Sequence, residues 1–125
     1  MRRVATNRVY FSPTTIYRNH ILEIYGEMMI NHFKLEDELE LTEWLGGIIM
    51  ITDEKTAHTL VEATLYKTFT PSHINDILQF IYPSDTDEKF NIRRTALHIS
   101  GIDISTGKII SKITPTILSE NTRHE

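Results

Sequence analysis

Period-two segments separated by turn residues fill the first half of the chain, and they constrain its fold more than any other feature. Residues 3–11 and 15–25 are predicted to be strands. The turn at 12–14 separates them, because its proline fixes φ and removes a ladder donor. Gly26 offers the glycine that a tight hairpin needs, and residues 28–35 are predicted to return as a third strand. Both alternating sets of 15–25 contain apolar groups, so we expect this strand to be covered on both faces for part of its length.

Shorter strands are predicted further along the chain. A glycine pair at 46–47 interrupts the next segment, and residues 48–51 are wholly apolar, which is typical of a buried strand. Strands are predicted again at about 93–104 and 107–114, with a turn at 105–107 between them.

Between these strands the apolar period changes to that of a helix. Residues 70–81 carry apolar side chains at i, i+3, i+4 and i+7, with Thr70 as the predicted N-cap and Pro71 at the first helical position. Residues 54–67 repeat the pattern less cleanly, and Asp53 is their predicted cap.

Together these segments predict an α+β fold. We expect a mainly antiparallel sheet, sandwich-like or an open barrel, packed against one or two helices at about 54–82. The length of 125 residues predicts a single domain over 1–125. The polar tail after about 116 is expected to be flexible.

Composition excludes several kinds of site. The chain has no cysteine, which excludes disulfides, thiolate nucleophiles and cysteine-based metal sites. No apolar run suits a signal peptide or a membrane helix, so we expect a cytoplasmic protein with no membrane partner. The net charge of −4 disfavours nucleic acid as a partner. Two oppositely charged sets are expected to be solvated faces, or to attract each other within a chain or between chains. They are Arg2, Arg3, Arg8 and Arg18, and Glu36, Asp37, Glu38, Glu40 and Glu43.

No motif combines the residues that catalysis or metal binding requires. The six histidines show neither the HxH nor the HExxH spacing of metal ligands. Residues 85–88 begin like a calcium loop but lack its glycine and its closing glutamate. Ser105 and Lys108 match S-x-x-K but lie in a predicted hairpin turn rather than on a helix. We therefore predict no catalytic residue, no cofactor site and no metal site. The histidines are His20, His32, His58, His73, His98 and His124.

Five residues are candidates for lining a pocket between sheet and helix, or for forming an interface. His20 and His32 flank the Gly26 hairpin and could approach each other across it, depending on register. Tryptophan is common as a core anchor and enriched at interfaces, so both interpretations apply to Trp44. The five candidates are Tyr10, Tyr17, His20, His32 and Trp44.

The order of strands over residues 4–52, closing with the Leu-Gly-Gly-Ile-Ile-Met run at 45–50, resembles the amino-terminal β-segment of amidohydrolase-superfamily enzymes. In that family the segment joins carboxyl-terminal strands in a small β-sandwich beside the catalytic barrel, and residues 94–114 could supply those strands here. The family continues into Pro-Gly and a metal-binding His-x-His, whereas residues 51–54 read Ile-Thr-Asp-Glu. The chain is also too short to hold a barrel. The resemblance therefore implies a sandwich-like accessory domain without the enzyme.

These observations predict a non-catalytic interaction or accessory module that self-associates or binds a partner protein. Edge strands and complementary charged segments in one chain motivate this prediction. The alternative is a small-ligand-binding protein, or a small enzyme, with its pocket between sheet and helix. Nucleic-acid binding through the arginine-bearing strands is the least favoured interpretation.

Overall fold

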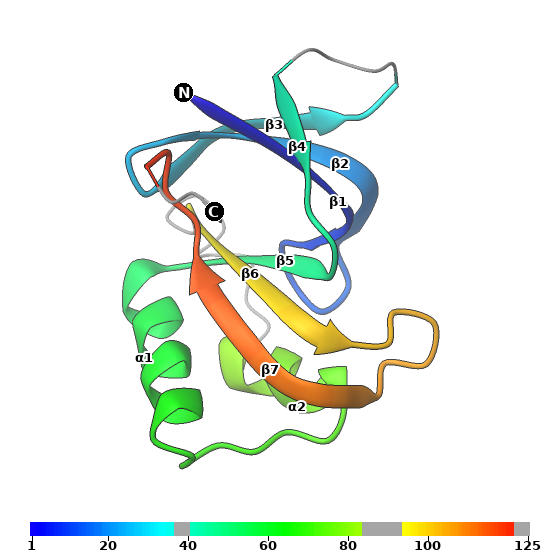
Figure 1. The fold of residues 1–125 in the computed structure, drawn as a ribbon, viewed down its shortest axis with the longest axis vertical. Helices are drawn as coiled ribbons and strands as arrows, with labels where there is room; N and C mark the ends of the chain where they lie inside the picture. The colour runs from blue at the N-terminus through cyan, green and yellow to red at the C-terminus, as the bar shows by residue number, and fades with distance from the viewer. Residues whose placement is uncertain (37–40, 84–93, 122–125) are drawn as a thin grey trace.

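A computed structural model describes residues 1–36, 41–83 and 94–121. Those residues form an α+β fold, in which two helices pack against an open, mostly antiparallel sheet of seven strands (Figure 1). The predicted fold class is confirmed. The elements are β1 (Arg2–Tyr10), β2 (Ile16–Tyr25), β3 (Met28–Lys34), β4 (Thr42–Trp44), β5 (Ile48–Thr52), α1 (Glu54–Leu65), α2 (Ile74–Ile81), β6 (Thr95–Ile102) and β7 (Ile109–Ile117).

The strands lie in the order β3-β2-β1-β5-β6-β7, and the short β4 also pairs with β1. Both β4 and β5 run parallel to β1 and follow each other along one of its edges. The chain steps from β4 to β5 through a glycine pair. Gly47 has φ +78°, and a Cβ atom there would lie 2.4 Å from the Ile99 carbonyl oxygen. Glycine is therefore required at this step for both conformational and steric reasons.

Strand β5 separates two hydrophobic cores, and all five of its residues are buried. Ile48 and Met50 belong to the core beneath the helices. Ile49 and Ile51 belong to the core between β5–β6 and the β1–β3 half of the sheet. A strand covered on both faces reads as a continuous apolar run, which explains the sequence at this point. Each such aliphatic side chain contributes about 1.5–3 kcal/mol on full burial.

The sheet bends over itself without closing into a barrel (Figure 1). The Met29 N–H donates to the Arg94 carbonyl at 2.7 Å, which ties β3 to the start of β6. Beyond α2, the Tyr82 hydroxyl lies 2.7 Å from the Ile51 carbonyl oxygen and 3.1 Å from that of Tyr10. This one hydroxyl therefore anchors the helical layer to both β5 and β1.

Helix α1 begins where the sequence predicts. The Asp53 side chain accepts from the Thr56 N–H at 2.7 Å, as an N-cap does. Helix α2 begins at Ile74, so the predicted N-cap at Thr70 is wrong. His73 is the cap instead, and it forms a capping box with Asp76.

Strand β7 causes this later start of α2. The Ser72 carbonyl accepts from the Ile109 N–H at 3.0 Å, and the Ile74 N–H donates to the Gly107 carbonyl at 2.7 Å. These bonds hold the segment before Ile74 extended against the β6–β7 turn. Long-range pairing thus replaces the extra helical turn that the local pattern favours.

The carboxyl-terminal strand is longer than expected. Strand β7 runs through Pro115 to Ile117, since an edge strand tolerates proline. After about 116, Leu118 is fully buried and the Glu120 carboxylate accepts from the Gly26 N–H at 2.9 Å. Residues 37–40, 84–93 and 122–125 lie outside the described residues, and with them most of the acidic segment, the predicted acidic loop and His124.

Candidate functional site

Three of the five candidate residues come together on one side of β2 and β3. His20 Nε2 lies 2.8 Å from His32 Nδ1, so one ring nitrogen donates and the other accepts. Tyr17 stacks on His20 with ring centroids 4.7 Å apart, and the Phe11 ring lies 4.6 Å from that of His32. We call Phe11, Tyr17, His20 and His32 the histidine cluster. Phe11 is the member that the sequence does not single out.

An asparagine brings Tyr17 and His20 to the same side of β2. In a regular strand, residues three apart point to opposite faces. Asn19 has φ +49°, which interrupts the alternation, and asparagine is one of the few residues that tolerate this conformation. Leu22 is two residues from His20 and shares its face of β2. His32 lies opposite Leu22 on β3, so its side chain is on the same side of the sheet as that of His20.

Both imidazoles of the histidine cluster are held in the neutral form at pH 7. Burial, and secondly the charge of His32, lower the pKa of His20 to about 4. Burial also lowers the pKa of His32. His20 lies at the edge of the core, and 5% of the residue is exposed. Desolvation disfavours the charged form of such a ring, and the mutual hydrogen bond uses one nitrogen of each neutral imidazole.

Among the residues that the structure describes, the histidine cluster lacks the further ligands of a metal centre. A structural zinc site takes four ligands, and a catalytic site takes three plus water. In the part of the chain that the structure describes, the group of three ligand-type side chains that lie together is Glu27, Glu54 and His58, whose ligand atoms fall within 4.8 Å of one another. All three are exposed, and exposed acidic groups commonly gather without an ion. The arrangement of the histidine cluster is that of packed, satisfied side chains.

The other two candidates lie elsewhere. Tyr10 is 3% exposed and packs beneath the helices. Trp44 is 53% exposed and lies opposite Ala5 of β1. Ala5 lies opposite Ile21, which lies opposite Phe33 of β3. Trp44, Ala5, Ile21 and Phe33 thus form a row across four strands, which we call the tryptophan row.

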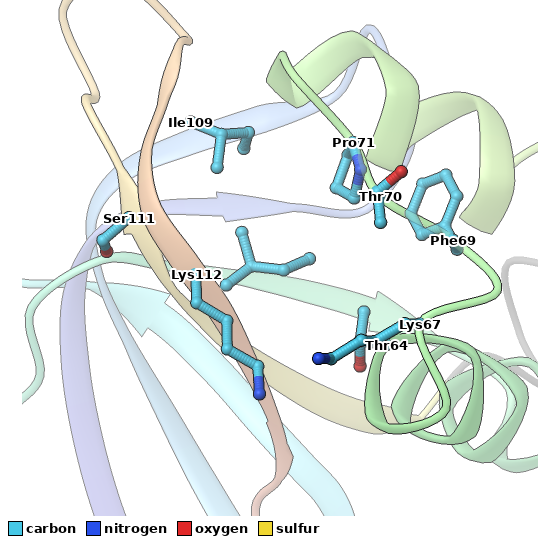
Figure 2. Close-up of a pocket in the computed structure, with 9 residues that line it drawn as sticks. Thr64, Lys67, Phe69, Thr70, Pro71, Ile109, Ser111 and Lys112 are labelled. Carbon is cyan, nitrogen blue, oxygen red and sulfur yellow. The ribbon is translucent and has the colours of Figure 1, made fainter.

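A cavity of about 220 Å³ lies between the end of α1, the loop before α2 and β7 (Figure 2). Its walls are mainly apolar, with lysine ammonium groups and hydroxyls at the margin. We call it the α1–β7 cavity. The residues that line it are Thr64, Lys67, Phe69, Thr70, Pro71, Ile109, Ser111, Lys112 and Ile113.

Two lysines reach the α1–β7 cavity from different elements. Lys67 follows α1, and Lys112 projects from β7; in Figure 2 both side chains extend toward the end of the cavity beside α1. Lys67 has φ +58°, a left-handed conformation in which its N–H donates to the Thr64 carbonyl. Among the described residues, the ion pairs involve neither lysine.

None of the five candidate residues lines this cavity. Its lining comes from the end of a helix, a loop and a distant strand, so no local spacing in the sequence marks it. The change of element between 65 and 74 is the nearest signal, because Pro71 and the extended residues beside it leave room next to β7. A cavity of this kind becomes visible only when the long-range packing is known.

The serine and lysine of the S-x-x-K match lie in the β6–β7 turn, as predicted. The Ser105 hydroxyl donates to the Asp103 carboxylate at 2.7 Å, which is an ordinary turn contact. Hydrogen bonds from Ser105, and then from Thr106, lower the pKa of Asp103. Nucleophilic chemistry has no support at this position.

Comparisons with known proteins return no relative: no family model, no curated protein and no solved structure matches this chain. The amidohydrolase-superfamily resemblance thus stays an expectation. In the described part of the chain, no helix combines the length and the apolar character needed to cross a membrane.

Proposed function

We propose that this protein binds a small molecule in the α1–β7 cavity. The observation that carries the proposal is the cavity itself: a hollow of about 220 Å³ with mainly apolar walls and a few polar groups at its margin. Small-molecule sites in proteins have this composition, and they favour the space between packed elements. The proposal corresponds to the small-ligand alternative, with a pocket between sheet and helix.

Binding is proposed rather than catalysis because of what the cavity lining contains. The described residues of the lining offer amines and hydroxyls, and they include no histidine and no carboxylate that would accept a proton from these groups. General acid–base chemistry needs such a group within hydrogen-bond reach of the reacting atom. The Thr64 hydroxyl is also occupied, since it donates to carbonyl oxygens of α1 at 3.0–3.1 Å.

A neutral apolar probe tests whether the cavity accepts a ligand. We expect 1-hexanol to shift the amide resonances of Thr64, Phe69 and Ser111 in a heteronuclear NMR titration. Thr70→Phe should abolish these shifts, because Thr70 is exposed at the cavity and a phenyl ring there would fill it. Thr59→Phe is the matched control on the exposed face of α1 and should bind as the unaltered protein does. Shifts spread over the whole surface, or unaffected by Thr70→Phe, would contradict the proposal.

Self-association is the second candidate function, and the tryptophan row supports it. Trp44 is 53% exposed beside Ala5, Ile21 and Phe33, and tryptophan is enriched in the central parts of protein interfaces. Ala5 and Ile21 are already buried within the chain, so a second copy presenting the same row would chiefly cover Trp44 in an isologous contact.

Some of the edges and charges that motivate self-association are used or protected within the chain. The Asn31 side chain accepts from the His32 N–H at 3.0 Å, which occupies a donor of edge strand β3. Edge strand β7 carries Lys112 and a proline, which disfavour strand pairing. Arg2 pairs with Glu43 at 2.6 Å, so this basic and acidic pair attracts within one chain. The tryptophan row is thus the surface that self-association would use.

Light scattering across a dilution series tests this second function. A dimer that dissociates on dilution, and that Trp44→Gln converts to a monomer at every concentration, would support it. Tyr66→Gln is the control, since Tyr66 is an aromatic residue at the end of α1 that is even more exposed than Trp44. A monomer at all concentrations, or a dimer unaffected by Trp44→Gln, would contradict it.

A further inference from the structure

We infer that the ligand of the α1–β7 cavity is a small organic anion: a carboxylate with a short apolar body, held by Lys67 and Lys112. This inference rests on the proposed function and adds the chemical class of the ligand. Three features of the cavity carry it, namely its walls, its pair of ammonium groups and the conformation of Lys67.

The walls select an apolar body of limited size. Phe69, Pro71 and Ile109 supply carbon surface on several sides of the cavity (Figure 2), and Ile113 also lines it. An apolar protein cavity of about 150 Å³ is known to hold benzene. The volume of about 220 Å³ therefore suits a ligand a few non-hydrogen atoms larger, such as a six-carbon chain with a polar head group.

The two lysines select a negative head group. Both line the cavity, and the ion pairs of the described residues leave both ammonium groups without an acidic partner. This is notable in an acidic chain, in which 17 Asp and Glu residues outnumber 13 Lys and Arg residues. A carboxylate at the cavity margin would accept charge-assisted hydrogen bonds from these two ammonium groups while its carbon chain contacts the walls.

The backbone of Lys67 adds an independent observation. Lys67 directly follows the C-cap Tyr66 of α1, in the left-handed conformation with φ +58°. Glycine is the residue that helices prefer at this position, because a side chain costs energy there. A lysine at a position suited to glycine indicates that its side chain is useful, and the cavity is what this side chain reaches.

A matched pair of probes tests the inference. Hexanoate and 1-hexanol have the same carbon chain and differ in charge, and both are titrated against the full chain by heteronuclear NMR at low ionic strength. We expect hexanoate to bind about tenfold more tightly than 1-hexanol, because of the charge-assisted contacts. The double variant Lys67→Met, Lys112→Met keeps the carbon stems and should bind the two probes equally. Lys55→Met, at the far end of α1, should keep the tenfold preference.

The outcomes separate the inference from the function on which it rests. If both probes shift the cavity resonances equally in the unaltered protein, the cavity binds ligands and the anionic preference is wrong. If the double variant keeps a preference for hexanoate, another group supplies the charge and the assignment to these lysines is wrong. If neither probe shifts the cavity resonances, the proposed function is wrong and the inference with it. A preference that weakens as salt is added would further support the charge contacts.

Discussion

The histidine cluster and the α1–β7 cavity are two candidate sites in one small fold, and they differ in how fully their polar groups are used. In the histidine cluster the rings touch each other, and the two imidazoles share a hydrogen bond of 2.8 Å. In the α1–β7 cavity the walls enclose about 220 Å³, and the ion pairs of the described residues include neither of its lysines. The histidine cluster is complete by itself, while the cavity has room and charge for another molecule.

The comparison shows which signals in a sequence point to function. Histidines and aromatic residues attract attention because they often serve as ligands and catalysts. In this protein, the histidines and aromatic residues of the histidine cluster pack against one another at the edge of a core. The functional candidate lies instead among threonines, lysines and a proline that carry no motif. If this contrast is correct, substitutions in the histidine cluster should affect stability, and substitutions of the cavity lysines should affect binding.

The largest expected effect is a loss of stability from His20→Ala. His20 is 5% exposed and stacks on Tyr17, so truncation leaves a cavity and removes the partner of the His32 ring. We expect the free energy of unfolding to fall by about 3 kcal/mol. Urea denaturation followed by the fluorescence of Trp44 measures it. A loss below about 1 kcal/mol would show that this cluster is not part of the folding core.

The second effect is a dependence of stability on pH. The pKa of His20 is lowered from 6.5 to about 4 in the folded protein, so the unfolded chain binds more protons between these values. Stability should therefore be constant above about pH 7 and fall as the pH drops from 6.5 toward 4, by about 2 kcal/mol between pH 7 and 5. His20→Phe should flatten most of this slope. Asp76 and Asp103 also have lowered pKa values, but they lose their stabilising contribution at lower pH. They therefore do not add to the slope between pH 7 and 5.

Much of the sheet was predictable because it depends on local patterns. The alternation in β1 and β2, the Gly26 hairpin and the apolar run of β5 each indicate their element within a few residues. The start of α2 was not predictable in this way. Its position depends on hydrogen bonds between Ser72 and Ile109, whose partners lie far apart in the sequence. Local spacing contains no information on such pairing.

The two sites also differ in how far local sequence patterns could predict them. The approach of His20 and His32 depends on the Gly26 hairpin together with the register shift between Glu23 and Ile24, because the unshifted hairpin would place His32 opposite Ile21, on the other face from His20. The position of Tyr17 depends on the left-handed conformation of Asn19, which the asparagine permits but does not require. The α1–β7 cavity requires the docking of a helix end on β7 and could be located only from the assembled structure.

The third prediction concerns Lys67, where stability and binding should change in opposite directions. Lys67→Gly relieves a left-handed conformation at the end of α1, so we expect it to stabilise the fold by about 1 kcal/mol. It should also weaken hexanoate binding, because it removes one of the two ammonium groups. Lys67→Ala is the control: it removes the same charge but keeps the strain, so its stability should change little. A destabilised Lys67→Gly variant would show that the lysine side chain supports the fold itself.

The smallest expected effect is on the stability of the double variant Lys67→Met, Lys112→Met. Neither ammonium group forms an ion pair with the described residues, and their carbon stems remain, so the free energy of unfolding should stay within about 0.5 kcal/mol of the unaltered value. Urea denaturation at pH 7 measures this difference under the conditions used for His20→Ala. A small loss of stability in the double variant, beside a large loss in His20→Ala, would place folding and ligand binding in different parts of the molecule. A loss of 2 kcal/mol or more in the double variant would instead make these lysines structural and remove the contrast between the two sites.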